Sequence, residues 1–339
     1  MVTIKDVAKV TGVSPSTVSR VIADSPSISP ETKKRVRKAM KKLGYYPNVN
    51  ARNLVVQSSK AIGVVMPSSA DKALQNPFFP EVLRGIGSVT HQMEYSLTLS
   101  TGQTEDEIYS EVERLVYGSV VDGIILLYSR LNDRVTNFLL EKDFPFVIVG
   151  KPYENENKIT YVDNDNVTAA KEITTHLIEK GHRKIAFIGG SSDLFVTKNR
   201  GAGYEKALQQ AGIPTCDKYK IHAEFLKSGG REAVKNLLSL ETVPTGIMVT
   251  DDLMALGVMS TLEEHGVRVP HDVSLVSFNN LYLSQITRPA LTTVDVQIYE
   301  LGVQSAKALI EKTANKGEPA KRIIIPHQII YRDSVNGVG

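Results

Sequence analysis

The stretch GVSPSTVSRVI, residues 12–22, places small hydroxyl side chains and one long guanidinium at the spacing of a short helix. Its apolar residues recur at helical intervals and predict a buried face. Pro15, Ser16 and Arg20 lie on the opposite face. An arginine can donate two parallel hydrogen bonds to a guanine edge, and small residues fit into a groove. The chemistry that this spacing predicts is hydrogen bonding to base pairs in the major groove of DNA.

A second set of polar and aromatic residues follows predicted β-strands in the rest of the chain. Parallel α/β sheets bind ligands at the carboxyl ends of their strands. Carboxylates, an amide, cations and planar rings together suit a hydroxyl-rich sugar, and they could also hold a purine. The predicted effector-binding residues are Asp71, Phe78, Phe79, Lys151, Asp163, Arg200, Asp251 and Asn279. Asn76, in the same loop as Asp71, is left out of this set.

The chain has none of the common catalytic motifs. GxxxxGK[ST], GxSxG and HExxH do not occur, and the histidines are scattered. The segment DNDN, residues 163–166, lacks the later glycine and glutamate of a calcium loop. The single cysteine, Cys216, has no evident histidine partner. We therefore expect no enzyme activity, no bound metal and no cofactor.

Charge is distributed unevenly along the 339 residues. Residues 1–60 carry twelve Lys or Arg and three Asp or Glu, a net charge of +9. The total is +3, which leaves −6 on the remaining chain. A basic head on a mildly acidic body predicts a polyanionic partner for the head alone. A single cysteine, with no signal peptide or membrane span in the sequence, predicts a cytoplasmic location.

Three short helices are predicted in the head, and each has its own start signal. Thr3 with Asp6 fits a capping box. Ser14 and Ser29 are N-caps, each followed by a proline at the first helical position. Glycines suit the left-handed ends of the first and third helices. Three helices with a tight turn between the first two predict a helix-turn-helix DNA-binding domain over residues 1–46.

From residue 61 onward, apolar strand patterns alternate with helical ones. This alternation predicts parallel sheets covered by helices on both faces. Nine strands suggest two doubly wound units that divide near Tyr161, with two late strands crossing back, one to each unit. The predicted fold class is therefore α/β, with a small helix-turn-helix domain and a two-lobed core. The predicted lobes are residues 61–160 with 291–321, and residues 161–290 with 322–335 for dimerisation and effector binding.

The segments TIKDVAKVTGVSPSTVSRVI and YYPNVNARNL resemble the head of the lactose/galactose repressor family, and the resemblance extends over nearly the whole chain. It implies a core similar to periplasmic sugar-binding proteins, which closes around a small effector. It also implies that hinge helices from residues 47–60 pair in the minor groove, where Leu54 wedges open a base step. The DNA-binding residues are then Thr3, Ser14, Pro15, Ser16, Thr17, Ser19, Arg20, Asn48, Asn50, Ala51, Arg52 and Leu54.

The segments NPFFPEVLRGI and VDNDNV look most like the maltose-operon repressors of Gram-positive bacteria, which implies maltose or a short maltodextrin as effector. Many relatives have an acidic residue where this chain has Asn279. An amide donates as well as accepts hydrogen bonds, so the site keeps fewer fixed acceptors. We expect Asp251 to bind paired hydroxyls opposite Arg200, and a second sugar ring to stack on Phe78 and Phe79.

Together these features predict a homodimeric repressor of a sugar-utilisation operon, released from a palindromic operator by its effector. One alternative is a regulator of the same family that responds to a purine or to a phosphoprotein co-repressor. The other is a cytoplasmic sugar-binding protein without DNA function, which would leave the basic head unexplained. No membrane partner is expected.

Overall fold

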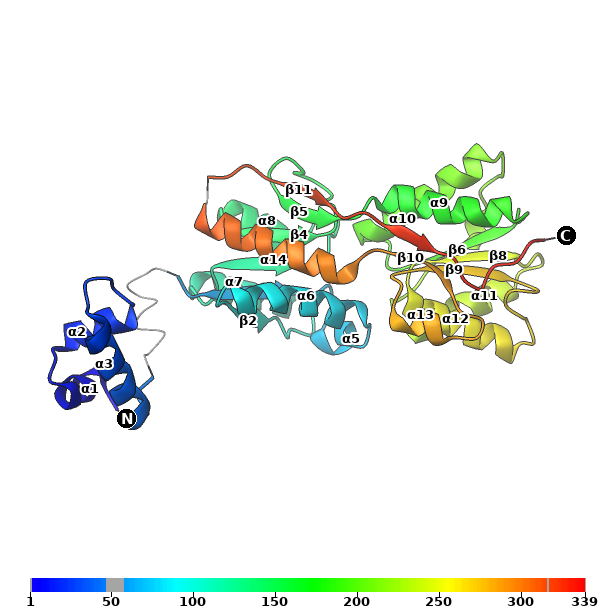
Figure 1. The fold of residues 1–339 in the computed structure, drawn as a ribbon. Helices are drawn as coiled ribbons and strands as arrows, with labels where there is room; N and C mark the ends of the chain where they lie inside the picture. The colour runs from blue at the N-terminus through cyan, green and yellow to red at the C-terminus, as the bar shows by residue number, and fades with distance from the viewer. Residues whose placement is uncertain (1, 47–57, 316, 339) are drawn as a thin grey trace. The chain divides into compact units, whose positions relative to one another are not determined.

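The computed structural model describes residues 2–46, 58–315 and 317–338. The predicted hinge contacts Asn48, Asn50, Ala51, Arg52 and Leu54 lie outside the described residues. The chain divides into two units, a head of residues 1–59 and a core of residues 60–339. Figure 1 shows the ribbon of both units.

The head folds as three helices around a small apolar core. The helices are α1 (Ile4–Thr11), α2 (Pro15–Ile22) and α3 (Pro30–Leu43). Val7, Val18 and Val36, one from each helix, are fully buried in one cluster. Burial of such a side chain contributes about 1.5–3 kcal/mol, so these valines determine how the three helices pack.

Capping residues start and end the head helices at the predicted positions. The Thr3 N–H donates to Asp6 Oδ2 at 2.8 Å, and Ser14 Oγ accepts from the Thr17 N–H at 3.1 Å. Gly12 has a φ of 67°, a left-handed conformation that glycine adopts without strain, and it turns the chain from α1 towards α2. The helix-turn-helix prediction is confirmed.

The first lobe of the core is a six-stranded parallel sheet in the order β11-β5-β4-β3-β1-β2. Helices α6 and α14 pack on one face and α7 and α8 on the other, which buries the central strands on both sides (Figure 1). The strands are β1 (Ala61–Val65), β2 (Ser96–Leu99), β3 (Gly123–Leu126), β4 (Phe146–Val149), β5 (Thr160–Asp163) and β11 (Arg322–Ile324). The helices are α5 (Ala70–Leu74), α6 (Phe78–Gln92), α7 (Glu105–Tyr117), α8 (Arg134–Glu141) and α14 (Ile298–Ala314).

The second lobe is a six-stranded sheet in the order β12-β10-β9-β8-β6-β7, in which only β12 runs antiparallel to its neighbour. Helices α9 and α10 pack on one face, and α11 and α12 on the other. The strands are β6 (Ile185–Gly189), β7 (Lys220–His222), β8 (Gly246–Val249), β9 (Ser274–Phe278), β10 (Thr292–Asp295) and β12 (Gln328–Ile330). The helices are α9 (Asn166–Glu179), α10 (Phe195–Gln210), the 3₁₀ turn η1 (Asp217–Tyr219), α11 (Lys227–Leu238), α12 (Asp252–Glu264) and α13 (Tyr282–Ile286).

The strand pairing corrects the predicted lobe boundaries at three places. Strand β5 belongs to the first sheet and ends at Asp163, so the lobes divide after Asp163 and not at Tyr161. Strand β10 belongs to the second sheet, although residues 291–321 were predicted for the first lobe, and β11 belongs to the first sheet instead of the second. An apolar pattern predicts a strand but does not specify which distant sheet edge completes its hydrogen bonds. Here the Tyr161 N–H donates to Lys321 O at 3.0 Å.

One buried amide holds together the three segments in which the chain crosses between the lobes. Asn164 follows β5, and its Nδ2 donates to Val296 O at 3.1 Å and to Ile325 O at 2.9 Å. Val296 follows β10 and Ile325 follows β11, so each residue belongs to a different crossing. This side chain fixes the crossings relative to one another at the base of the interlobe cleft.

Candidate functional site

The second helix of the head presents the side chains that the sequence predicts for base contacts. Val18 and Val21 are buried, whereas Pro15, Ser16 and Arg20 are exposed on the other side of α2. Ser19 is exposed as well. No hydrogen bond or ion pair holds the Arg20 side chain among the described residues. A free guanidinium on an exposed helix face can donate both of its parallel N–H groups to a base edge.

The other predicted contacts in the head also shape its local structure. Ser14 Oγ lies 2.8 Å from Ser16 Oγ and 2.9 Å from Thr17 Oγ1. The Thr3 hydroxyl donates to Asp6 Oδ2 at 2.7 Å. These hydroxyl groups therefore begin α1 and α2, while Thr3, Ser14 and Ser16 keep an exposed surface.

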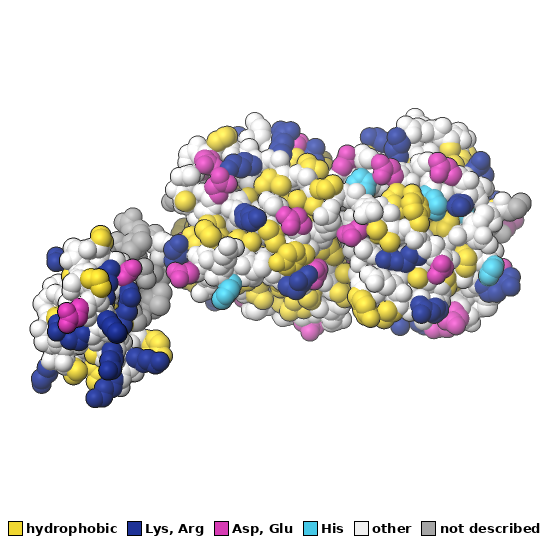
Figure 2. Space-filling model, viewed as in Figure 1, with side chains coloured by type: hydrophobic (Ala, Val, Ile, Leu, Met, Phe, Trp, Pro, Cys, Tyr) yellow, Lys and Arg dark blue, Asp and Glu magenta, His cyan; other side chains and the backbone are white. Residues whose placement is uncertain are grey.

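A basic surface covers α3. Figure 2 shows Lys and Arg side chains gathered over this helix, and Lys34, Lys38 and Lys41 are among its exposed residues. Asp24 binds two further cations, Lys33 at 3.0 Å and Arg37 at 2.6 Å. The ion pair with Asp24 compensates part of the charge of Lys33 and of Arg37 inside the head. The remaining cations supply an attractive, sequence-independent potential for a polyanion.

A cleft between the two lobes of the core brings together most of the predicted effector-binding residues. The space between its walls is about 770 Å³, counting the part open to solvent. The predicted residues that line it are Phe78, Phe79, Asp163, Arg200, Asp251 and Asn279. They come from both lobes. Asp163, Asp251 and Asn279 lie at the carboxyl ends of strands, as the fold class predicts, whereas Phe78, Phe79 and Arg200 lie on the helices α6 and α10.

Arg200, on α10, is the buried cation of the cleft. Its Nε donates to Asn166 Oδ1 at 2.8 Å and its Nη1 to Thr250 O at 2.6 Å, and the guanidinium stacks on the Phe278 ring at 4.2 Å from the centroid. Burial lowers the pKa of Arg200 to about 10, which leaves it charged at neutral pH. The described residues provide no partner for Nη2. The network thus fixes the guanidinium plane and leaves N–H groups available to a ligand.

A carboxylate held between two amides spans the cleft. Asp251 Oδ2 accepts from Asn76 Nδ2 at 3.0 Å, across the lobes, and from Asn279 Nδ2 at 2.8 Å, while Oδ1 caps α12 through the Met254 N–H. Asn279 Oδ1 is buried without a hydrogen-bond partner among the described residues, and so is Thr250 Oγ1. Both residues line the cleft, so their oxygens can bind hydroxyl groups.

A buried carboxylate behind the cleft shapes the loop that carries Asn279. Asp252 accepts hydrogen bonds from the Leu281 N–H at 2.7 Å and from the hydroxyl groups of Thr293 and Ser277. Burial raises the pKa of Asp252 to about 7. Asn279 has a φ of 105°, which is uncommon for a residue other than glycine and which these anchors maintain.

Asp163, at the end of β5, is a second buried carboxylate that lines the cleft. It accepts from the Lys151 N–H at 3.0 Å and from Asn166 Nδ2 at 2.9 Å. Burial raises the pKa of Asp163 to about 6, although these hydrogen bonds and the charge of Arg200 oppose the change. An ionised Asp163 is a strong acceptor for a ligand hydroxyl.

Aromatic rings form the apolar wall of the cleft. Phe78 and Phe79 meet edge to face, with ring centroids 5.3 Å apart and an interplanar angle of 84°. Tyr128 and Phe225 also line the cleft, and neither is among the residues predicted to bind the effector. Both lie near the carboxyl ends of the strands that the sequence predicts over residues 123–129 and 220–225, and that position was the available signal.

Two predicted residues do not line the cleft, and one omitted residue does. Asp71 is exposed on α5. The Lys151 ammonium pairs with Glu156 at 3.1 Å, and only its backbone N–H reaches Asp163. Asn76 is buried and joins the two lobes through Asp251 and through Phe225 O at 3.0 Å. Its position in the same loop as Phe78 placed it near the site, but its partners are about 150 and 175 residues away in sequence.

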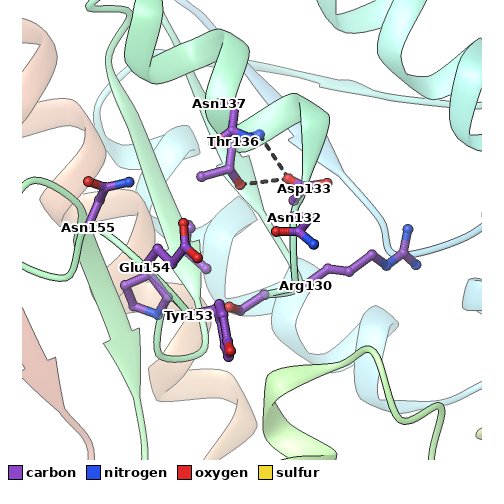
Figure 3. A pocket seen from close by; sticks show the side chains of 11 residues that line it. Arg130, Asn132, Asp133, Thr136, Asn137, Tyr153, Glu154 and Asn155 are labelled. Carbon is purple, nitrogen blue, oxygen red and sulfur yellow. Dashed lines mark hydrogen bonds between the residues drawn. The ribbon is translucent and has the colours of Figure 1, made fainter.

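A smaller polar hollow lies next to the cleft on the first lobe. Figure 3 shows Asn132, Tyr153, Glu154 and Asn155 around it, and Thr136 hydrogen-bonded to Asp133. Among the described residues, no cluster of three or more His, Cys, Asp or Glu side chains could hold a metal ion. In that same part of the chain, no helix is long and apolar enough to span a membrane.

Two family models match this chain. Residues 3–48 match the model described as bacterial regulatory proteins, lacI family. Residues 174–335 match the model described as a periplasmic binding protein-like domain. The first match coincides with the helix-turn-helix head, and the second covers most of the second lobe together with α14 and β11 of the first lobe.

Similar proteins cover both units. The HTH-type transcriptional regulator MalR of Streptococcus pneumoniae is 43% identical over 98% of this chain and 99% of its own. The lac repressor dimer bound to operator and the anti-inducer ONPF is 25% identical, with a TM-score of 0.87 over 99% of each chain. A probable maltose operon transcriptional repressor from Staphylococcus aureus is 28% identical, with a TM-score of 0.74 over 82% of this chain and 98% of that one. These similar proteins are transcription regulators.

Proposed function

Because this chain belongs to the lacI family of bacterial regulatory proteins, we propose that it represses a sugar-utilisation operon. In this proposal it binds a palindromic operator as a homodimer and leaves the operator when a sugar binds in the core. The proposed effector is maltose or a short maltodextrin. One observation carries the proposal. The same chain has an exposed face on α2 and a buried cleft lined by polar and aromatic side chains.

Arg20 is the proposed base-reading residue of the head. It is the one long cationic side chain on the exposed face of α2, and small side chains flank it. The exposed lysines of α3 would attract the phosphate backbone without reading sequence. Asn50 and Leu54 keep their predicted roles in the hinge as part of this proposal.

The proposed sugar site uses groups that the protein itself leaves free. Arg200 Nη2 would donate to a hydroxyl group at one end, and the unpartnered Asn279 Oδ1 would accept from another. Both oxygens of Asp251 already accept protein hydrogen bonds. We therefore assign Asp251 to positioning Asn76 and Asn279, in place of direct binding of paired hydroxyls.

The aromatic wall favours a ligand with more than one ring. Phe78 and Phe79 present different faces to the cleft because they meet edge to face, and Phe225 adds a third ring. A disaccharide can place one ring among the polar groups and the other against this wall. The similarity to a probable maltose operon repressor supports maltose over other disaccharides.

A homodimer fits the apolar side chains that the core leaves exposed. Tyr282 and Ile286 of α13 are 72% and 52% exposed, and Leu97 and Leu99 are exposed on the edge strand β2. Exposed apolar patches and unpaired strand edges mark surfaces that bind another chain. A two-fold dimer would also match the symmetry of a palindromic operator.

Calorimetry of the full-length chain tests the effector. Maltose and maltotriose are expected to bind more tightly than glucose or galactose, because only the longer ligands reach both the polar groups and the aromatic wall. A gel-shift titration with genomic DNA fragments, with and without sugars, tests whether the sugar releases the protein from its operator. Tight binding of guanine or hypoxanthine, with no response to any maltodextrin, would replace the sugar effector by a purine and leave the DNA-binding function in place.

A further inference from the structure

The two lobes touch beside the cleft through the segments 129–131 and 193–195. The first follows β3 in one lobe, and the second follows β6 in the other. The Phe195 N–H donates to Ser129 O at 2.9 Å, and the Leu131 N–H donates to Asp193 O at 3.1 Å, which makes an antiparallel bridge. Because each bond joins one lobe to the other, both bonds form only when the lobes are closed.

The Arg130 side chain ties this bridge to the ends of two other elements. Its Nη2 donates to Pro67 O at 2.7 Å, and its Nη1 binds the Glu105 carboxylate. Its Nε lies 2.7 Å from Asp193 Oδ2 in the opposite lobe, although the N–H direction is not that of a hydrogen bond. Figure 3 shows Arg130 extended away from the side chains around the polar hollow. Two contacts within its own lobe thus hold the guanidinium against the other lobe.

Burial distinguishes this ion pair from another that crosses the cleft. In the first pair, the side chains of Arg130 and Asp193 are 18% and 40% exposed. In the second pair, the side chains of Lys72 and Glu224 lie 3.0 Å apart and are 54% and 61% exposed. Exposed pairs gain little because water screens them and ordering two long side chains costs entropy. Arg130 is already ordered by Pro67 and Glu105, so its contact with Asp193 costs less entropy than the exposed pair does.

We propose that Arg130 and Asp193 form a latch that holds the lobes closed before any effector binds. Arg130 does not line the cleft, so it is a positioning residue and not a ligand contact. Apparent ligand affinity scales with the fraction of molecules in the binding-competent form. The latch raises that fraction by favouring the closed form. The part of this inference that concerns the effector rests on the proposed sugar-binding function, and the part that concerns lobe closure does not.

Hydrogen–deuterium exchange of the full-length, effector-free chain tests the latch without a ligand. Peptides that contain residues 131 and 195 are expected to be protected in the unmodified protein, because their amides donate across the lobes. In Arg130→Ala and in the milder Asp193→Asn, exchange in both peptides should rise by roughly threefold to tenfold. Arg134→Ala is the matched control, since Arg134 is an exposed arginine that pairs with Asp106 inside the first lobe. Unprotected amides in the unmodified protein, or unchanged exchange in both latch variants, would overturn the proposal.

Stopped-flow binding of maltose then separates positioning from a general loss of structure. Without the latch, maltose should dissociate roughly threefold to tenfold faster, with a smaller rise in the association rate and a correspondingly weaker affinity. Unchanged maltose kinetics together with faster exchange would overturn the positioning role of Arg130. No maltose binding to the unmodified protein would contradict the proposed effector, and the exchange experiment would still decide whether the latch exists.

Discussion

The recognition helix of the head and the interlobe cleft of the core place their functional side chains in opposite ways. On α2, Ser16 and Arg20 project from an exposed face whose geometry is set within the same helix. In the cleft, Arg200 and Asp251 are buried and held by partners from distant parts of the chain. Local capping therefore determines the proposed DNA-reading surface, whereas long-range hydrogen bonds determine the proposed effector site.

If the cleft depends on its buried network, removal of its cation should have the largest effect. Arg200→Ala leaves Asp163 and Asp251 buried without a nearby positive charge, and breaking a buried charge network costs about 3–5 kcal/mol. We expect the core to lose about that much free energy of unfolding and maltose affinity to fall by at least about tenfold. Urea denaturation and calorimetry measure the two effects.

Arg183→Ala is the control for that change, because the Arg183 side chain bonds only backbone oxygens near its own position in the described structure. It should alter neither quantity appreciably. Equal stability and affinity in Arg200→Ala and Arg183→Ala would mean that Arg200 is not the organising cation of the cleft.

The pH dependence of stability provides a second way to separate the two regions. Burial raises the pKa of Asp163 to about 6 from an ordinary 3.8, so between these values the folded core holds a proton that the unfolded chain releases. The free energy of unfolding therefore falls as pH rises through this window, by up to about 3 kcal/mol from Asp163. Asp163→Asn should flatten this part of the profile, whereas the exposed Asp71→Asn should not. Denaturation at a series of pH values would contradict the prediction if both variants kept the full slope.

A substitution on the exposed face of α2 should change DNA recognition and leave the core unaffected. Arg20→Ala is expected to lose about 1–3 kcal/mol of discrimination at one symmetric pair of operator positions. Lys38→Ala removes an exposed cation of α3 and should weaken all sequences alike. Competition binding to a randomised operator library distinguishes these outcomes, and an unchanged sequence profile for Arg20→Ala would place the recognition face elsewhere.

The smallest expected effect concerns the N-cap residue of α2 in the head. Ser14→Ala removes the oxygen that accepts from the Thr17 N–H at 3.1 Å. Loss of such a cap costs about 1 kcal/mol of stability. The thermal midpoint of the head should fall while that of the core stays constant. A head that melts unchanged would show that Ser14 does not stabilise the start of α2.

The sequence predicts the head almost completely because its signals are local. Ser14, the proline after it and Gly12 specify where helices begin and end within a few residues. The α/β class of the core follows from the same kind of local pattern. The sequence did not predict which sheet the strands near the lobe crossings join, because β10 and β11 have short apolar patterns that would fit either sheet.

The cleft could be predicted only in part. Residue types at strand ends located Arg200 and Asn279, since those positions follow from the fold class. Lys151 was predicted to bind the effector, yet its ammonium is paired with Glu156 in a contact that no strand-end rule anticipates. Asn76 and Asn164 were missed as organising residues because their hydrogen bonds join segments far apart in the sequence.

The most direct test of the proposed function is operator binding by the full-length chain during a maltose titration. Maltose should release the operator over the same concentration range in which calorimetry detects binding to the cleft. Asn279→Ala, which removes the unpartnered oxygen of the cleft and the amide that donates to Asp251, should shift that release to higher maltose concentration and leave maltose-free operator affinity unchanged. Operator binding that ignores maltose, or that becomes tighter as maltose is added, would contradict the proposed control of the head by the cleft.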